Sequence, residues 1–143
     1  MIEKNFQLFD TKFKVDKYLI TTSDYWRLSV RPFQPTLGST IISLNRPCEN
    51  FADITSCESA DLKEIVSYTE HNLKQAFKYD RINYLMLMMV DPHLHFHVIP
   101  RYSSALTFFD TQWSDNGWPA QPELGGREIT DDEARNIIQA IKG

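Results

Sequence analysis

The most informative segment of this chain is Asp91-Pro92-His93-Leu94-His95-Phe96-His97-Val98-Ile99-Pro100-Arg101. Three of the four histidines of the chain occur here at every second position, with apolar residues between them. Such strict alternation predicts a β-strand, because successive side chains of a strand point to opposite faces of the sheet. We therefore expect the apolar residues to face a core and the histidines to form a row on the opposite face. This row consists of His93, His95 and His97.

The spacing of the row suggests phosphate chemistry. Neighbouring histidines would lie about 6.6 Å apart along the strand, since a strand rises about 3.3 Å per residue. Three imidazoles at this spacing can surround one phosphoryl group, whereas a metal-binding pair on a helix would need the spacing i, i+4. A single histidine on a strand is usually structural. Three in alternation are hard to explain by packing, because a buried imidazole is costly without partners.

The segment resembles the histidine-triad family of nucleotide hydrolases and transferases, whose motif is His-x-His-x-His-x-x with apolar residues at x. Residues 93–99 fill this motif without a mismatch. The Pro100-Arg101-Tyr102 that follows is similar to the fragile-histidine-triad branch and its bacterial relatives, which hydrolyse dinucleoside polyphosphates. The resemblance extends more loosely from Phe13 to Tyr102, and it implies a homodimer.

His95 is the expected nucleophile. It is the central member of the row, and a neutral imidazole, with an ordinary pKa of about 6.5, is a good nucleophile near neutral pH. The resemblance implies the same residue, which would form a nucleotidyl-histidine intermediate by attack on the α-phosphate of the substrate. His93 and His97 would orient His95 and bind the phosphoryl oxygens and the leaving group. No cofactor is expected apart from Mg²⁺ bound to the substrate phosphates.

Three further residues are candidates for substrate binding. Family members commonly have a Pro-Gly-His segment where this chain has Leu37-Gly38-Ser39, so Ser39 stands in place of an upstream histidine. Arg31 replaces a polar residue that helps to hold the nucleotide in the family, although it could also be an ordinary loop charge. Arg101 could be a charge clamp at the rim of the site or a member of a surface ion pair. The connection before the histidines is shortened, and Val90 stands near the position of a phosphate-contacting glutamine.

Length and composition restrict the number of domains and the classes of function. The 143 residues are enough for one domain with a substantial core. A net charge of -4 argues against broad binding to nucleic acid or to membrane surfaces. The first five residues mix charges without an apolar run, so no signal peptide is expected. Cys48 and Cys57 form neither a disulfide framework nor a CxxC metal site, which favours a reducing cytoplasm.

Other segments predict the remaining secondary structure. Strands are expected over residues 18–22, 25–30 and 39–44, and the proline-rich loop 31–38 should join antiparallel neighbours. A capping box at Thr55 and Glu58 begins a helix from about 57 to 78, whose apolar stripe should pack on Leu94 and Phe96. The apolar run 82–90 predicts a strand buried on both faces, joined tightly to the histidine strand by Asp91-Pro92. Residues 6–17 fit either a helix or an extended arm.

The C-terminal part has no clear period between residues 103 and 127, and an ordered loop is expected there. Trp113 and Trp118 could stack on a base or cover a partner subunit. A second capping box, at Thr130 and Glu133, predicts a short final helix. Together these expectations describe a single α+β domain, 1–143, with a loop-rich extension over 103–143. Its antiparallel sheet has about five strands, with one long helix across one face and the histidine face open to substrate.

Two other functions fit the same residues. The row could hold zinc or iron through neutral imidazoles, although no nearby Asp, Glu or Cys completes a ligand set with obvious spacing. The chain could also be a nucleotide-binding module that has lost turnover, because Ser39 and the shortened connection depart from the family pattern.

Overall fold

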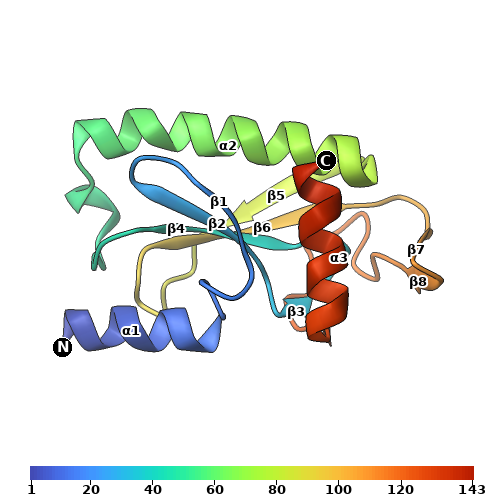
Figure 1. The fold of residues 1–143 in the computed structure, drawn as a ribbon, viewed down its shortest axis with the longest axis horizontal. Coiled ribbons are helices and arrows are strands. Elements are labelled where there is room, and N and C mark those ends of the chain that lie inside the picture. Colours follow the sequence, from blue (N-terminus) through green and yellow to red (C-terminus); the bar gives the residue numbers. More distant parts are fainter.

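A computed structural model describes residues 1–143 as a five-stranded antiparallel sheet with helices on both faces (Figure 1). The sheet contains β1 (Leu19–Thr22), β2 (Trp26–Val30), β4 (Thr40–Leu44), β5 (Arg81–Leu85) and β6 (His95–Arg101). The helices are α1 (Ile2–Lys12), α2 (Ser56–Phe77) and α3 (Asp131–Lys142), with one 3-10 turn at Phe51–Asp53. The predicted α+β class and five-stranded sheet are confirmed. No helix is both long and apolar enough to cross a membrane.

The histidine strand occupies an inner position, since the strand order is β1-β2-β4-β6-β5. It pairs with β4 so that Ser43 lies opposite His95 and Ile41 opposite His97. β2 and β4, which the proline-rich loop connects, are antiparallel neighbours as predicted. Of the three histidines, only His97 has a strand partner on each side, because the register with β5 ends at Leu85 opposite His97, while His95 pairs with β4 alone.

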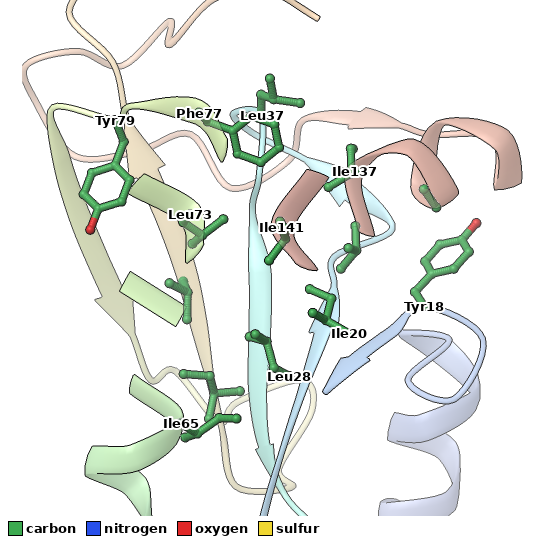
Figure 2. Packing of buried hydrophobic residues seen from close by; sticks show 14 of the residues in the cluster. Tyr18, Ile20, Leu28, Leu37, Ile65, Leu73, Phe77, Tyr79, Ile137 and Ile141 are labelled. Atoms are coloured by element: carbon green, nitrogen blue, oxygen red, sulfur yellow. The ribbon is translucent and has the colours of Figure 1, made fainter. Parts of the chain in front are cut away.

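The long helix α2 packs on the face that carries Leu94 and Phe96, as predicted. Its capping box is present, with Thr55 accepting from the Glu58 amide and Glu58 accepting from the Thr55 amide. The helix ends at Phe77, and Lys78, which follows it, is in the left-handed conformation. Figure 2 shows side chains from α2 and α3 meeting side chains from the strands in one core. The labelled members on the two helices are Ile65, Leu73, Phe77, Ile137 and Ile141.

The N-terminal segment, which the sequence leaves undecided, is a helix that covers the histidine face. Figure 1 shows α1 and α2 on opposite sides of the sheet. His93 and His95 are each only 1 % exposed and His97 is 6 % exposed. The expectation of an open histidine face is therefore wrong. The physical reason is that Phe6, Phe9 and Phe13 offer aromatic surfaces against which the flat imidazole rings pack.

The predicted strand over residues 82–90 is present only over Arg81–Leu85, where it pairs with the histidine strand as expected, and the prediction that it is buried on both faces is wrong. β5 ends at Leu85 and lies at the edge of the sheet, with β6 as its only neighbour. Residues 86–94 form a connection that leaves the sheet, and in it Leu87 is 51 % exposed while Met89 and Val90 are each 84 % exposed. The predicted tight turn at Asp91-Pro92 is therefore a longer excursion. An apolar run does not distinguish core packing from the lining of a pocket, and here the second half of the run serves the pocket.

The C-terminal extension contains short strands that the sequence does not reveal. β7 (Leu106–Phe108) and β8 (Thr111–Trp113) form a hairpin, and β9 (Arg127–Glu128) pairs with β3 (Phe33–Gln34). Strands of two or three residues are too short to show a period. The predicted capping box at Thr130 and Glu133 is present at the start of α3. α3 packs against α2, β1 and β2.

Candidate active site

A pocket of about 570 Å³ lies beside the C-terminal end of α1, and the buried His95 and His97 are among its lining residues. Its charged groups are Lys12, Arg31 and Asp91. The rest of the lining is mostly apolar and comes from the end of α1, the proline-rich loop, the 86–94 connection and the C-terminal extension. These apolar residues are Phe13, Pro32, Phe33, Leu87, Met88, Met89, Val90 and Leu124. The pocket therefore combines two cations with an apolar wall next to two of the three triad histidines.

His95 is held by hydrogen bonds at both ring nitrogens. Its Nδ1 is bonded to the backbone carbonyl oxygen of His93. Its Nε2 lies 3.2 Å from Nε2 of His97. A carbonyl oxygen can only accept, so Nδ1 carries the proton and Nε2 of neutral His95 carries the lone pair. This lone pair is thereby directed toward His97, at the side of the row that borders the pocket.

His93 is buried and does not line the pocket. Its Nε2 is 2.9 Å from the carbonyl oxygen of Leu44, on the neighbouring strand β4. Its ring packs on Phe6 and Phe9 at centroid distances of 4.6 and 5.0 Å. The structural contribution of His93 to the site is its backbone carbonyl oxygen, which accepts a hydrogen bond from Nδ1 of His95.

Burial keeps the triad neutral. It lowers the pKa of His93 to about 4, against the raising effect of the hydrogen bond with Leu44. The pKa of His97 is lowered to about 3, first by burial and then by the neighbouring His95 and Arg31. The pKa of His95 is also lowered, again chiefly by burial. All three imidazoles are therefore in the neutral form at neutral pH, so one nitrogen of His95 retains its lone pair.

Arg31 lies beside the row. Its Nε donates to Nδ1 of His97 at 3.3 Å, and its Nη1 donates to the carbonyl oxygens of Phe33 and Gly125 at 2.6 and 3.3 Å. Burial lowers the pKa of this guanidinium from its ordinary value. The structure thus brings Arg31 together with His95 and His97 in one pocket.

The structure does not bring Ser39 or Arg101 into this pocket. Ser39 is fully buried, and its Oγ donates to the carbonyl oxygen of Thr36 at 2.8 Å. Arg101 is buried against Asp115, with Nε 2.7 Å from Oδ2, and its Nη1 donates to Asn83. Buried charges require such pairing. Both side chains hold chain segments together, and the geometry gives neither a contact with the triad.

The two tryptophans of the extension also lie away from the triad. Trp113 is buried in the core with the guanidinium of Arg127 over its ring at 4.3 Å. Trp118 borders a separate hollow formed with β5 and Arg101. Neither lines the pocket that contains His95, so the geometry does not support stacking of a base on them there.

Several pocket residues could not be identified from the sequence. Lys12 comes from α1 and bonds both carboxylate oxygens of Asp91 at 2.9 Å. Leu87, Met88 and Met89 belong to a run that predicted core packing. The only available sequence signal for them is that a methionine-rich stretch directly precedes the histidine motif, and methionine is common at adaptable binding surfaces.

A family model for the HIT domain matches residues 13–104. The chain therefore belongs to the HIT domain family. No curated protein sequence matches it. No group of three or more His, Cys, Asp and Glu side chains has an arrangement that could hold a metal ion.

Solved structures share the fold. A histidine triad protein from Sinorhizobium meliloti superimposes with a TM-score of 0.70 and 20 % identity, covering 90 % of each chain. A diadenosine triphosphate hydrolase from Plasmodium falciparum gives a TM-score of 0.66 at 12 % identity, covering 88 % of this chain and 74 % of its own. A zinc-bound histidine triad family protein from Mycobacterium smegmatis gives 0.64 at 14 %, covering 94 % and 91 %. At these identities the likeness establishes the fold.

Proposed function

We propose that this chain is a nucleotide hydrolase or nucleotidyl transferase that cleaves its substrate at the α-phosphate through a nucleotidyl-His95 intermediate. The observation that carries the proposal is the fixed orientation of His95. Its Nδ1 proton is bound by the His93 carbonyl, which leaves the Nε2 lone pair next to a pocket with two cations. A neutral, oriented imidazole of this kind is a suitable nucleophile for phosphoryl transfer.

The reaction has two steps. His95 Nε2 attacks the α-phosphorus, the bond from phosphorus to the bridging oxygen breaks, and the leaving group departs with that electron pair. Water then attacks the same phosphorus and releases a proton to solvent, and the P–Nε2 bond breaks with its electron pair returning to Nε2 of His95. Lys12 and Arg31 would offset negative charge on the phosphoryl oxygens. Because His95 is only 1 % exposed, the substrate must displace the contact between His95 and His97.

Dinucleoside polyphosphates are the proposed substrates. Two cations suit a chain of phosphates, and the apolar wall around Leu87 and Met89 suits the face of a base. The shared fold with the Plasmodium hydrolase of diadenosine triphosphate is compatible with this class. Mg²⁺ would enter with the substrate phosphates, since the pocket itself offers only one carboxylate, Asp91.

The test is to mix the purified protein with diadenosine triphosphate, quench early and measure the intact mass. A mass increase of one adenylyl group on the wild type, absent from His95→Ala, is the expected result. His71→Ala is the matched control, because His71 is exposed on α2 and far from the motif in sequence. Binding without turnover or adduct would instead indicate a nucleotide-binding module, and stoichiometric zinc in the purified protein would favour a metal site.

We further propose that residues 1–143 act as one HIT-like domain that forms a homodimer. The outer edge of β5 has no strand partner, and a shallow apolar surface beside it is lined by Leu62, Val66, Tyr84 and Phe96. An unpaired strand edge next to apolar surface favours association with a second copy. Sedimentation equilibrium should give twice the chain mass, and Val66→Lys should shift it toward the monomer. A monomeric wild type at micromolar concentration contradicts this proposal.

The expected location is a reducing cytoplasm, consistent with the free thiols of Cys48 and Cys57.

A further inference from the structure

A continuous chain of hydrogen bonds runs from Arg31 through His97 and His95 to the backbone of His93. We propose that Arg31 is a positioning residue that fixes the tautomer of His97, and through it the proton arrangement around His95. This inference rests on the proposed function, because it assigns Arg31 a task in the same reaction. It differs from substrate binding by Arg31, which would require the charge of the guanidinium and not its contact with His97.

Arg31 Nε is the first donor in this series of hydrogen bonds. A guanidinium has only donors, so the 3.3 Å contact of Arg31 Nε requires Nδ1 of His97 to accept. A neutral His97 with Nδ1 unprotonated must carry its proton on Nε2. That Nε2 lies 3.2 Å from Nε2 of His95, to which it can only donate. Arg31 therefore determines that His95 Nε2 is the acceptor in the pair of histidines.

At the opposite end, the His93 carbonyl acts on His95 directly and on His97 only through the 3.2 Å contact between the two rings. The His93 carbonyl oxygen can only accept, so His95 Nδ1 is the donor and His95 Nε2 must be unprotonated when the ring is neutral. The contacts at both ends of this series of hydrogen bonds thus place a lone pair on Nε2 of His95, the proposed nucleophile. The proton on His97 Nε2 is then available to a phosphoryl oxygen or a departing oxygen once the substrate separates the two rings.

The guanidinium is itself held in place. Its Nη1 is bound by the carbonyl oxygens of Phe33 and Gly125, which come from the proline-rich loop and from the C-terminal extension. The backbone of Arg31 is fixed as well, because its amide donates to the Ser39 carbonyl and its carbonyl accepts from Gln34 Nε2. This network gives buried Ser39 a supporting task in place of a substrate contact. An arginine with so many fixed contacts can define the tautomer of a neighbour with little loss of entropy.

The Arg31 contact also selects the neutral form of His97. An imidazolium has protons on both nitrogens and cannot accept from Arg31 Nε. The charged or titratable groups facing His97 are His95 on its own strand, Arg31 on the proline-rich loop and Lys12 on α1. None of them is acidic. A proton on His97 would therefore lose one hydrogen bond and add a cation beside two others.

Three substitutions separate the contact from the charge. Gln places an N–H donor at the position that Nε has along the arginine side chain, without the charge. Lys keeps the charge but places a methylene group there, and Met supplies neither donor nor charge. The tautomer of His97 is measured from the imidazole ¹⁵N and ¹³C shifts of the substrate-free protein. Turnover of diadenosine triphosphate is measured in parallel.

In the wild type and in Arg31→Gln, we expect His97 to be protonated at Nε2 only. Arg31→Lys and Arg31→Met should give a mixture of tautomers, with kcat reduced roughly tenfold to a hundredfold, the range for loss of one charge-assisted hydrogen bond. Arg31→Lys should change KM least, and Arg31→Gln should raise KM while lowering kcat least. Unchanged melting temperatures establish that each variant is folded.

Two results would overturn the proposal. One is a wild type in which His97 carries its proton on Nδ1. The other is the reverse order of the variants, with Arg31→Lys retaining the tautomer and kcat while Arg31→Gln loses both, which would reduce Arg31 to a phosphate-binding charge. If no variant, and not even the wild type, turns over a nucleotide, the proposed function fails. The imidazole shifts still decide the tautomer in that case.

Discussion

The two faces of the sheet differ in what they bury. The face under α2 and α3 carries a cluster of 21 buried apolar residues, whereas the cluster under α1 has only four: Phe9, Phe13, Val15 and Ile41. Beneath α1 the strands present polar side chains instead, including Arg27, Ser29 and Ser43 besides the histidines. Because apolar burial supplies most of the stability, the α2 face stabilises the fold, whereas the α1 face contributes less stability and carries the candidate active site.

The α1 face is held by polar contacts at its borders. Arg27 Nη1 lies 2.9 Å from Asp10 Oδ2, and Lys12 Nζ lies 2.9 Å from Asp91. Ser29 Oγ, Ser43 Oγ and His93 Nδ1 have no hydrogen-bond partner within the protein. Buried polar atoms without partners lower the stability of the surface that contains them. We therefore expect α1 to open at a lower free energy than the rest of the fold.

The largest difference between the faces should come from deleting core volume under α2. Leu73→Ala should lower the free energy of unfolding by roughly 3–5 kcal/mol, because it leaves a cavity among fully buried side chains. Urea unfolding followed by circular dichroism measures this. Leu87→Ala is the matched control, since Leu87 is exposed and should change stability by less than about 0.5 kcal/mol. Equal losses in the two variants would contradict the division between the faces.

Acid should destabilise the α1 face. The folded pKa of His93, about 4, lies below the ordinary imidazole value of about 6.5, so the unfolded chain binds more protons between these values. The contribution of His93 to stability is thus complete above pH 6.5 and is lost as the pH falls toward 4. For His93 alone the loss is about 3 kcal/mol.

The measurement is urea unfolding at several pH values between 7 and 4. His93→Asn should flatten the dependence on pH, whereas His71→Asn should not, because the His71 side chain is exposed in the folded chain. A stability that stays constant from pH 6.5 to 4 in the wild type would show that the triad is not buried as the structure has it.

A cavity on the α1 face should lower the stability of α1 without affecting α2. Phe9 is buried and packs on His93 and His95, so Phe9→Ala should weaken the docking of α1 by about 2 kcal/mol. Amide exchange over residues 2–12 should then accelerate roughly thirtyfold while α2 exchanges as before. Leu8→Ala, an exposed position on the same helix, is the control. Equal acceleration in α2 would mean that the two faces unfold as one unit.

The smallest effect is expected at the Lys12–Asp91 ion pair. Lys12 is 51 % exposed and Asp91 21 % exposed, and surface pairs of this kind contribute about 0–1 kcal/mol. Lys12→Met should speed amide exchange in α1 slightly, and added salt should remove the difference from wild type. Lys17→Met removes another exposed pair, with Asp131, and should not affect α1. A loss above about 2 kcal/mol in Lys12→Met would require a role for Lys12 beyond this pair.

Much of the architecture was predictable because it depends on local patterns. The alternation of residues 93–99 predicted the strand, which the structure has over His95–Arg101, and its two faces, and it led to the proposed nucleophile. The capping boxes at Thr55 and Thr130 marked the starts of α2 and α3, since capping involves only the first turn of a helix. These features need no knowledge of distant residues.

Contacts between distant segments could not be predicted. The sequence identified the histidine row, but only the tertiary structure showed that Phe9 covers it, that Leu87 and Met89 line a pocket, and that Arg101 pairs with Asp115. Arg31 lies 66 positions before His97 and yet donates to it. Periodicity specifies which face of an element a side chain occupies. What packs against that face depends on how the elements are assembled, and no local pattern records this.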